Sequence, residues 1–258
     1  MLARSGNQVD EGHQDSKKAT RPSLFSTAND EAYWKTIQDE FNFKPNQIYM
    51  NSATLGLTPR RAMEDMQERF ERLSRGSYRM EKGPRQIIAD ILGVKVSEIS
   101  LTHNTTEGIN IVAAGLPLKK RDEVIVTSHE HVGNALPWLN RARLDGIRLK
   151  VFDPAPTAAE TLNRINDLIT RRTRVIAVPH ITCTTGQVLP IREISRLGRS
   201  KGIWVFLDGA HGPLTTALDL KDIDCDFYAS CGHKWLCGPS GTGMLYVRES
   251  LLDTVEAR

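Results

Sequence analysis

The stretch Asp226-Phe227-Tyr228-Ala229-Ser230-Cys231-Gly232-His233-Lys234-Trp235 places a lysine just beyond a short apolar run that is typical of a buried strand. A glycine-bearing loop, Gly238-Pro239-Ser240-Gly241-Thr242-Gly243, follows the lysine. Upstream, a second strand-like run, Ile203-Trp204-Val205-Phe206-Leu207, leads into Asp208. Two strand ends would therefore present an amine and a carboxylate.

The same alternation of strand-like and helix-like runs extends through most of the chain. Runs rich in Val and Ile are expected as strands at residues 99–102, 123–127, 149–152, 175–178, 203–207, 226–229 and 243–247. Amphipathic runs between them are expected as helices at residues 106–114, 133–144, 158–170 and 191–201. This alternation predicts an α/β fold in which helices cover both faces of a mainly parallel, seven-stranded sheet.

Two further helices are expected ahead of the first strand. An N-terminal segment, residues 28–45, contains a helix-like run at residues 29–41. A longer helix is expected at residues 58–73, because Thr58 is a good cap and Pro59 suits the first helical position.

Composition indicates an ordinary globular protein. The chain has 258 residues, of which 40% are hydrophobic and 25% charged, and its net charge of +3 is dispersed, so nucleic acid is not an expected partner. No apolar run reaches the roughly 20 residues of a membrane helix. Residues 1–27 are polar and lack the apolar core of a signal peptide, so we expect a disordered tail and a cytoplasmic protein.

Cysteine and histidine patterns do not favour a metal site. None of the four cysteines forms a CxxC pair, and reduced thiols are expected. His129 and His131 resemble metal ligands, but their side chains should diverge and no third ligand is evident, so no metal is expected. A nucleophilic pair of His180 and Cys183 is conceivable and needs a geometry that sequence does not give.

An amine and an acid at adjacent strand ends can hold both ends of a pyridine aldehyde. Lys234 would form a Schiff base, and Asp208 would stay ionised and keep the ring nitrogen protonated. Ala210 is small enough to lie against a flat ring, and His211 could bond its phenolic oxygen. The alternative for Asp208 is a turn acid, since Asp-Gly is a common turn pair. The pattern favours a pyridoxal-phosphate (PLP) site.

Two more strand ends could complete such a site. Asn104-Thr105-Thr106-Glu107-Gly108 follows a strand and opens a helix, where free backbone N–H groups and two hydroxyls would bind a phosphate. An ordinary helix cap explains Thr105 and Thr106 equally well. His131 could stack on an aromatic ring, and a surface loop histidine is the alternative.

These motifs, in this order and at this spacing, resemble the class V aminotransferase family of fold-type I PLP enzymes, in the branch of cysteine desulfurases, selenocysteine lyases and isopenicillin N epimerase-like proteins. The resemblance covers residues 46–258. It is carried by His103 to Asn110, Glu130-His131, His180 to Gly186, Asp208 to His211, and Ser230 to Lys234 with Gly238-Pro239.

The resemblance implies a PLP-binding large domain and assigns roles within it. It makes Lys234 the Schiff-base lysine and Asp208 the acid on the ring nitrogen. It implies that His131 stacks on the ring, that His211 lies near the phenolic oxygen, and that Thr105, Thr106 and His233 bind the phosphate. Cys231 stands where the family often carries a phosphate-binding serine, so weaker phosphate binding is expected.

An enzyme that acts on an amino acid, of desulfurase or epimerase type, is the function that the resemblance implies. An aminotransferase of the same family, or a PLP-binding domain without turnover, is the alternative. The family continues into a small C-terminal domain that these 258 residues lack, and it forms homodimers. Poor turnover by this chain alone is therefore expected.

Overall fold

The structure is a computed structural model that describes residues 30–44, 46–77 and 83–256. The chain divides into two units, Met1–Asp39 and Glu40–Arg258. The tail expected at residues 1–27 lies outside the described residues.

The described part of the first unit is helix α2 (Glu31–Asp39) with the residue before it. Asp30 caps this helix, because its Oδ1 accepts a hydrogen bond of 3.1 Å from the backbone N–H of Tyr33. The helix is shorter than the expected run 29–41, and residues 40–44 are not helical. The expectation that this run continues to residue 41 was therefore wrong.

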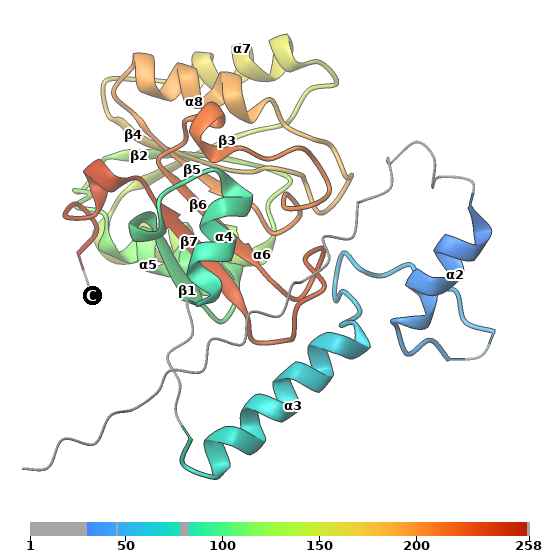
Figure 1. Ribbon diagram of the computed structural model, residues 1–258. Coiled ribbons are helices and arrows are strands. Elements are labelled where there is room, and N and C mark those ends of the chain that lie inside the picture. Colours follow the sequence, from blue (N-terminus) through green and yellow to red (C-terminus); the bar gives the residue numbers. More distant parts are fainter. Residues whose placement is uncertain (1–29, 45, 78–82, 257–258) are drawn as a thin grey trace, which may run out of the picture. The chain divides into compact units, whose positions relative to one another are not determined.

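The second unit is built on one seven-stranded sheet with the order β1-β7-β6-β5-β4-β2-β3 (Figure 1). The strands are β1 (Ile99–Thr102), β2 (Glu123–Thr127), β3 (Arg148–Phe152), β4 (Thr173–Pro179), β5 (Trp204–Asp208), β6 (Phe227–Cys231) and β7 (Gly243–Val247). Strands β3, β2, β4, β5 and β6 pair in parallel, whereas β7 is antiparallel to both of its neighbours, β6 and β1. The prediction of a mainly parallel sheet is confirmed.

Helices cover both faces of this sheet, as expected (Figure 1). The helices of this unit are α3 (Arg60–Ser74), α4 (Pro84–Leu92), α5 (Thr105–Gly115), α6 (Val132–Asp145), α7 (Ala158–Leu168), α8 (Ile191–Ser200) and α9 (Leu220–Ile223), with 3-10 turns η1 (Val96–Glu98) and η2 (Glu249–Leu251). Successive side chains of a strand point to opposite faces, so one strand contributes side chains to two hydrophobic cores. In β5, Phe206 packs with residues of α5 and α6, and Leu207 packs with residues of α4, α7, α8 and α9.

The start of α3 differs from the sequence prediction. Pro59 occupies the cap position and no side chain caps the helix. The hydroxyl of Thr58 instead donates a 3.2 Å hydrogen bond to the carbonyl of Gly238, in the loop that follows Lys234. Thr58 therefore ties the N-terminal part of this unit to the far end of its sequence rather than capping a helix.

Helix α4 was not expected from the sequence. It begins at Pro84 and ends before Gly93, which adopts a left-handed conformation with φ of 71°. Within the described residues, no helix is both long enough and apolar enough to cross a bilayer.

The topology brings several strand ends to one edge of the sheet. Parallel strands end at the same edge, which is where open α/β sheets bind ligands. Asp208 closes β5 and Cys231 closes β6, while the segments after β1 and β2 lead into α5 and α6. Strand β1 runs parallel to β6 because both are antiparallel to β7.

Candidate active site

A cavity of about 460 Å³ lies at this edge of the sheet. All eight residues that the sequence assigned to a cofactor site line it together. They are Thr105, Thr106, His131, Asp208, Ala210, His211, His233 and Lys234. The cavity is also lined by Ala53, Thr54, Asn104, Ile109, Cys183 and Cys231.

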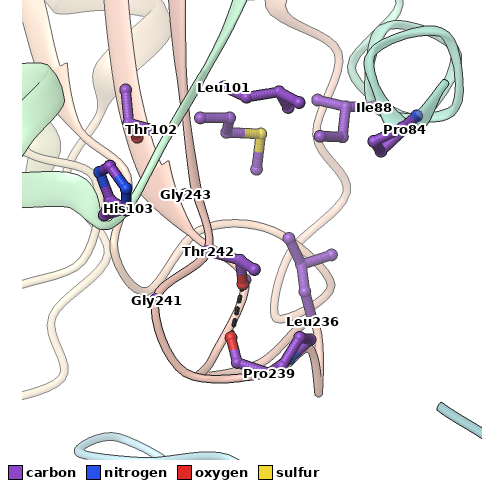
Figure 2. Close-up of a pocket in the computed structure, with 12 residues that line it drawn as sticks. Pro84, Ile88, Leu101, Thr102, His103, Leu236, Pro239, Gly241, Thr242 and Gly243 are labelled. Carbon is purple, nitrogen blue, oxygen red and sulfur yellow. Dashed lines mark hydrogen bonds between the residues drawn. The ribbon is translucent and has the colours of Figure 1, made fainter. Parts of the chain in front are cut away.

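A second cavity, of about 420 Å³, lies beside β1, α4 and the loop after Lys234 (Figure 2). Its walls include Ile88, Leu101, Leu236 and Met244, and the described residues that line it offer neither an amine nor a carboxylate. His103 also lines this cavity, but its Nδ1 lies 2.8 Å from Oε2 of Glu107, and the largely apolar wall offers no counterpart to the lysine and aspartate of the first cavity. The first cavity is therefore the candidate active site.

Lys234 and His211 meet inside the candidate site. The Nζ of Lys234 lies 3.4 Å from Nε2 of His211. The indole N–H of Trp235 donates a 3.1 Å hydrogen bond to Nδ1 of the same histidine. Burial lowers the pKa of His211 to about 4, and the positive charges of Lys234 and His131 act in the same direction. His211 is therefore neutral near pH 7.

Asp208 is buried at the end of β5. Its Oδ1 accepts a 2.9 Å hydrogen bond from the backbone N–H of Ala210. Burial raises the pKa of this carboxyl, while the Ala210 hydrogen bond and the positive charge of Lys234 oppose the rise. The sequence prediction of an ionised Asp208 assumed a cationic ring beside it. A protonated ring nitrogen beside Asp208 would lower its pKa again and so favour the ionised carboxylate.

The N-terminus of α5 combines a helix cap with an unused hydroxyl. Asn104 Oδ1 accepts a 2.9 Å hydrogen bond from the backbone N–H of Glu107. Asn104 is therefore the residue that caps α5, rather than Thr105 or Thr106. Thr105 Oγ1 is nevertheless buried without a hydrogen-bond partner among the described residues, and so is Nδ1 of His233. Burial without a partner is costly, so these two atoms on the cavity wall fit a ligand rich in oxygen, such as a phosphate. A hydrogen bond from the Thr105 hydroxyl to the ionised sulfur of Cys231 would oppose the rise in thiol pKa that burial causes, so the hydroxyl is without a partner while the thiol keeps its proton.

His131 is exposed and is the cap residue that precedes α6. Its Nδ1 accepts a 3.0 Å hydrogen bond from the backbone N–H of Gly133, and this bond restrains the orientation of the imidazole ring. A Cβ atom at Gly133 would lie 2.5 Å from Oγ1 of Thr106, so a glycine is needed for these two cavity walls to approach. Among the described residues, no group of three His, Cys, Asp or Glu side chains could hold a metal.

His180 and Cys183 are separated by the structure. His180 is buried, with Nδ1 3.1 Å from the hydroxyl of Tyr228 and Nε2 3.4 Å from that of Thr216, and it does not line the cavity. Cys183 lines the cavity, but burial raises its thiol pKa, which disfavours the nucleophilic thiolate. Nothing in this geometry favours a Cys–His pair.

The loop at residues 51–56 supplies wall residues that sequence reasoning missed. Ala53 and Thr54 line the cavity, and the backbone N–H of Gly56 donates a 2.6 Å hydrogen bond to the carbonyl of His233. The small residues of this loop were a signal of close approach, but they did not indicate which part of the chain would be approached.

A mainly parallel sheet with a lysine and a buried acid at its carboxyl edge is the arrangement expected of a PLP-dependent enzyme. A family model described as aminotransferase class-V matches residues 48–257, and the chain belongs to this family. The sequence is 30% identical over 240 residues to isopenicillin N epimerase of Streptomyces clavuligerus, covering 87% of this chain and 59% of that protein. It is 34% identical over 222 residues to a probable cysteine desulfurase of Methanothermobacter thermautotrophicus, covering 82% and 55%.

Solved structures agree with this placement. The cysteine desulfurase CsdA of Escherichia coli superimposes with a TM-score of 0.78 at 29% identity, covering 86% of this chain and 59% of that one. A variant of C-DES, solved with glycine covalently linked to its PLP cofactor, gives a TM-score of 0.78 at 28% identity, covering 85% and 61%. The chain thus spans between half and two thirds of the length of these relatives.

Proposed function

We propose that this chain binds PLP covalently through Lys234 and forms the cofactor-binding part of an enzyme that acts on an amino acid. The observation that carries the proposal is the placement of Lys234, the buried Asp208 and the unpartnered hydroxyl of Thr105 on one cavity. These are the three chemical groups that the aldehyde, ring nitrogen and phosphate of PLP require. The C-DES structure, which was solved with PLP, supports PLP as the cofactor.

Bound PLP would supply an aldehyde for the amino group and a ring that withdraws electrons from the substrate's Cα. Lys234 would bond to the aldehyde and, once displaced by substrate, accept the proton from Cα. Asp208 would hold the ring nitrogen in its protonated form. Thr105, Thr106 and His233 would bind the phosphate. Ala210 and His131 would lie against the ring, and His211 would donate to the phenolic oxygen.

Relatives narrow the reaction type. The relatives include an isopenicillin N epimerase and a probable cysteine desulfurase, so a desulfurase- or epimerase-type reaction is the favoured function. Transamination needs the same residues and remains the second candidate on this scaffold. A PLP-binding domain without turnover is the third, and we propose a cytoplasmic location for the protein.

Borohydride trapping tests the proposal. Protein incubated with PLP should develop a visible absorption band, and borohydride should fix the cofactor irreversibly on Lys234, as located by peptide mass spectrometry. Lys234→Arg should lose the band and the adduct, whereas Lys201→Arg, at an exposed lysine, should keep both. An adduct on another lysine, or none at all, would contradict the proposal.

A homodimer is also proposed, on the strength of helix α6. Val132, Leu136 and Leu139 recur at helical spacing and are 62%, 58% and 51% exposed. Val132 and Leu136 line a pocket of about 250 Å³ together with Thr106 and His131 of the candidate site. A second copy that covers this apolar face would shield the site from solvent.

A further inference from the structure

Trp235 follows Lys234 directly in sequence, yet it does not line the candidate active site. Its indole N–H donates a 3.1 Å hydrogen bond to Nδ1 of His211. The two rings meet edge to face, with centroids 6.4 Å apart and an angle of 64° between planes. This contact has no part in the roles proposed so far, which concern the residues on the cavity wall.

The contact determines where His211 carries its proton. An indole N–H is a donor only, so Nδ1 of His211 must be the acceptor. Neutral imidazole carries one proton, and His211 is neutral because burial and the nearby charges of Lys234 and His131 disfavour a cation. The proton must therefore sit on Nε2, the nitrogen that faces Lys234.

Nε2 of His211 lies 3.4 Å from Nζ of Lys234. With its proton on Nε2, the imidazole can donate to the lone pair of a neutral amine, which is the form that attacks an aldehyde. An ammonium group has only donors and would oppose the Nε2–H. The opposite tautomer would remove this effect, because a bare Nε2 would accept a hydrogen bond from the ammonium.

We propose that Trp235 is a positioning residue that fixes the tautomer of His211, so that the Nε2–H is directed into the cavity toward Lys234. The same proton would be directed at the phenolic oxygen of bound PLP, a consequence that rests on the proposed function. Trp235 thereby acts on the reacting amine through His211 without touching cofactor or substrate.

The first test measures the tautomer itself in PLP-free protein. Long-range ¹H–¹⁵N spectra of the imidazole should show wild-type His211 protonated on Nε2 and bare on Nδ1 at pH 7.5. Trp235→Phe removes the indole N–H and keeps an aromatic ring, and it should give a mixture of both tautomers. Trp204→Phe is the control, because Trp204 packs against the core between the sheet and helices α5 and α6. It should leave the His211 signals unchanged.

The second test measures capture of PLP by Lys234, read as the rate at which the visible band appears. Trp235→Phe should slow capture at pH 7.5 by about tenfold, because the His211 proton is then no longer held on the nitrogen that faces the amine. In a His211→Gln background, adding Trp235→Phe should change the rate less than about twofold, because the path through His211 is already lost.

The outcomes separate the two proposals. A wild-type His211 protonated on Nδ1, an unchanged tautomer in Trp235→Phe, or equal slowing in the His211→Gln background would each overturn the inference. If wild-type protein fails to capture PLP, the proposed function fails, and the tautomer spectra alone decide the role of Trp235.

Discussion

The backbone N–H of Gly56 donates a 2.6 Å hydrogen bond to the carbonyl of His233, across most of the sequence of the second unit. A Cβ atom at position 56 would lie 1.8 Å from the carbonyl oxygen of Lys234, which is backbone and cannot turn aside. The loop at residues 51–56 thus rests directly on the segment that presents the reactive lysine.

Gly56→Ala should therefore disturb the site as well as the fold. Overpacking of this kind costs roughly 1–3 kcal/mol of stability, and displacement of the Lys234 segment should weaken PLP binding by about tenfold or more. Thermal melts and PLP titrations measure the two effects. Gly76→Ala is the control, because it strains a left-handed residue with nothing within 4 Å of its new Cβ; it should lower stability and leave PLP affinity unchanged. Unaltered PLP affinity in Gly56→Ala would show that the loop does not support the lysine.

Asp208→Asn should change PLP affinity and stability in opposite senses. Asparagine keeps the acceptor for the Ala210 N–H but cannot pair with a protonated ring nitrogen, so PLP should bind about 10 to 100 times more weakly. Burial raises the pKa of Asp208, so its ionised form destabilises the PLP-free fold as pH rises. The variant should then melt no lower than wild type at pH 8. Equal PLP affinity in the two proteins would remove Asp208 from the proposed site.

The sequence predicted the sheet and the reactive strand ends because both depend on local pattern. Apolar runs rich in Val and Ile place each predicted strand within two residues of its observed bounds. Lys234 and Asp208 were identified because each follows such a run, and parallel strands end at a common edge.

The missed features depend on contacts between distant parts of the chain. Thr58 is a good helix cap by type, but the carbonyl of Gly238, distant in sequence, competes for its hydroxyl. Ala53 and Thr54 reach the cavity through the Gly56 contact, which no local pattern encodes. His180 also follows a strand end, yet its ring bonds the buried hydroxyl of Tyr228 and does not line the cavity.

Glu130 should make stability depend on pH. Its Oε1 accepts from the backbone N–H of Thr127 at 3.0 Å and its Oε2 from Nδ2 of Asn134 at 2.7 Å. Burial, with a smaller effect of Asp208, raises its pKa from 4.5 to about 7. Between these values the folded state holds a proton that the unfolded state releases. The free energy of unfolding should therefore fall as pH rises from about 4.5 through about 7.

Glu130→Gln isolates this contribution, because His180 and His211 titrate with the opposite sign: their pKa values are lowered to about 4. Relative to wild type, the variant should gain at most about 3 kcal/mol in unfolding free energy between pH 4.5 and pH 8. Urea unfolding at several pH values measures this difference. A constant offset at every pH would mean that Glu130 titrates normally in the folded state.

Leu136→Asp tests the proposed dimer. A charge in the middle of the apolar face of α6 should prevent a second copy from covering it, and sedimentation should change from dimer to monomer at micromolar concentration. Leu144→Asp is a matched control, since Leu144 is 66% exposed on the same helix but lies off the line of Val132, Leu136 and Leu139. A monomeric wild-type protein, or dissociation by both variants alike, would contradict the assignment of this face.

Thr105→Val asks whether the unpartnered hydroxyl on the cavity wall binds phosphate. Valine keeps the shape of threonine and removes the Oγ1 that has no partner among the described residues. A hydrogen bond to a charged phosphate contributes roughly 1.5–3 kcal/mol, so PLP affinity should fall by about 10 to 100 times. Pyridoxal, which lacks the phosphate, should bind the variant and the wild type equally well, as measured by competitive titration of the visible band. Equal losses for both ligands would place the effect in the shape of the cavity, and no loss for PLP would exclude Thr105 from the phosphate site.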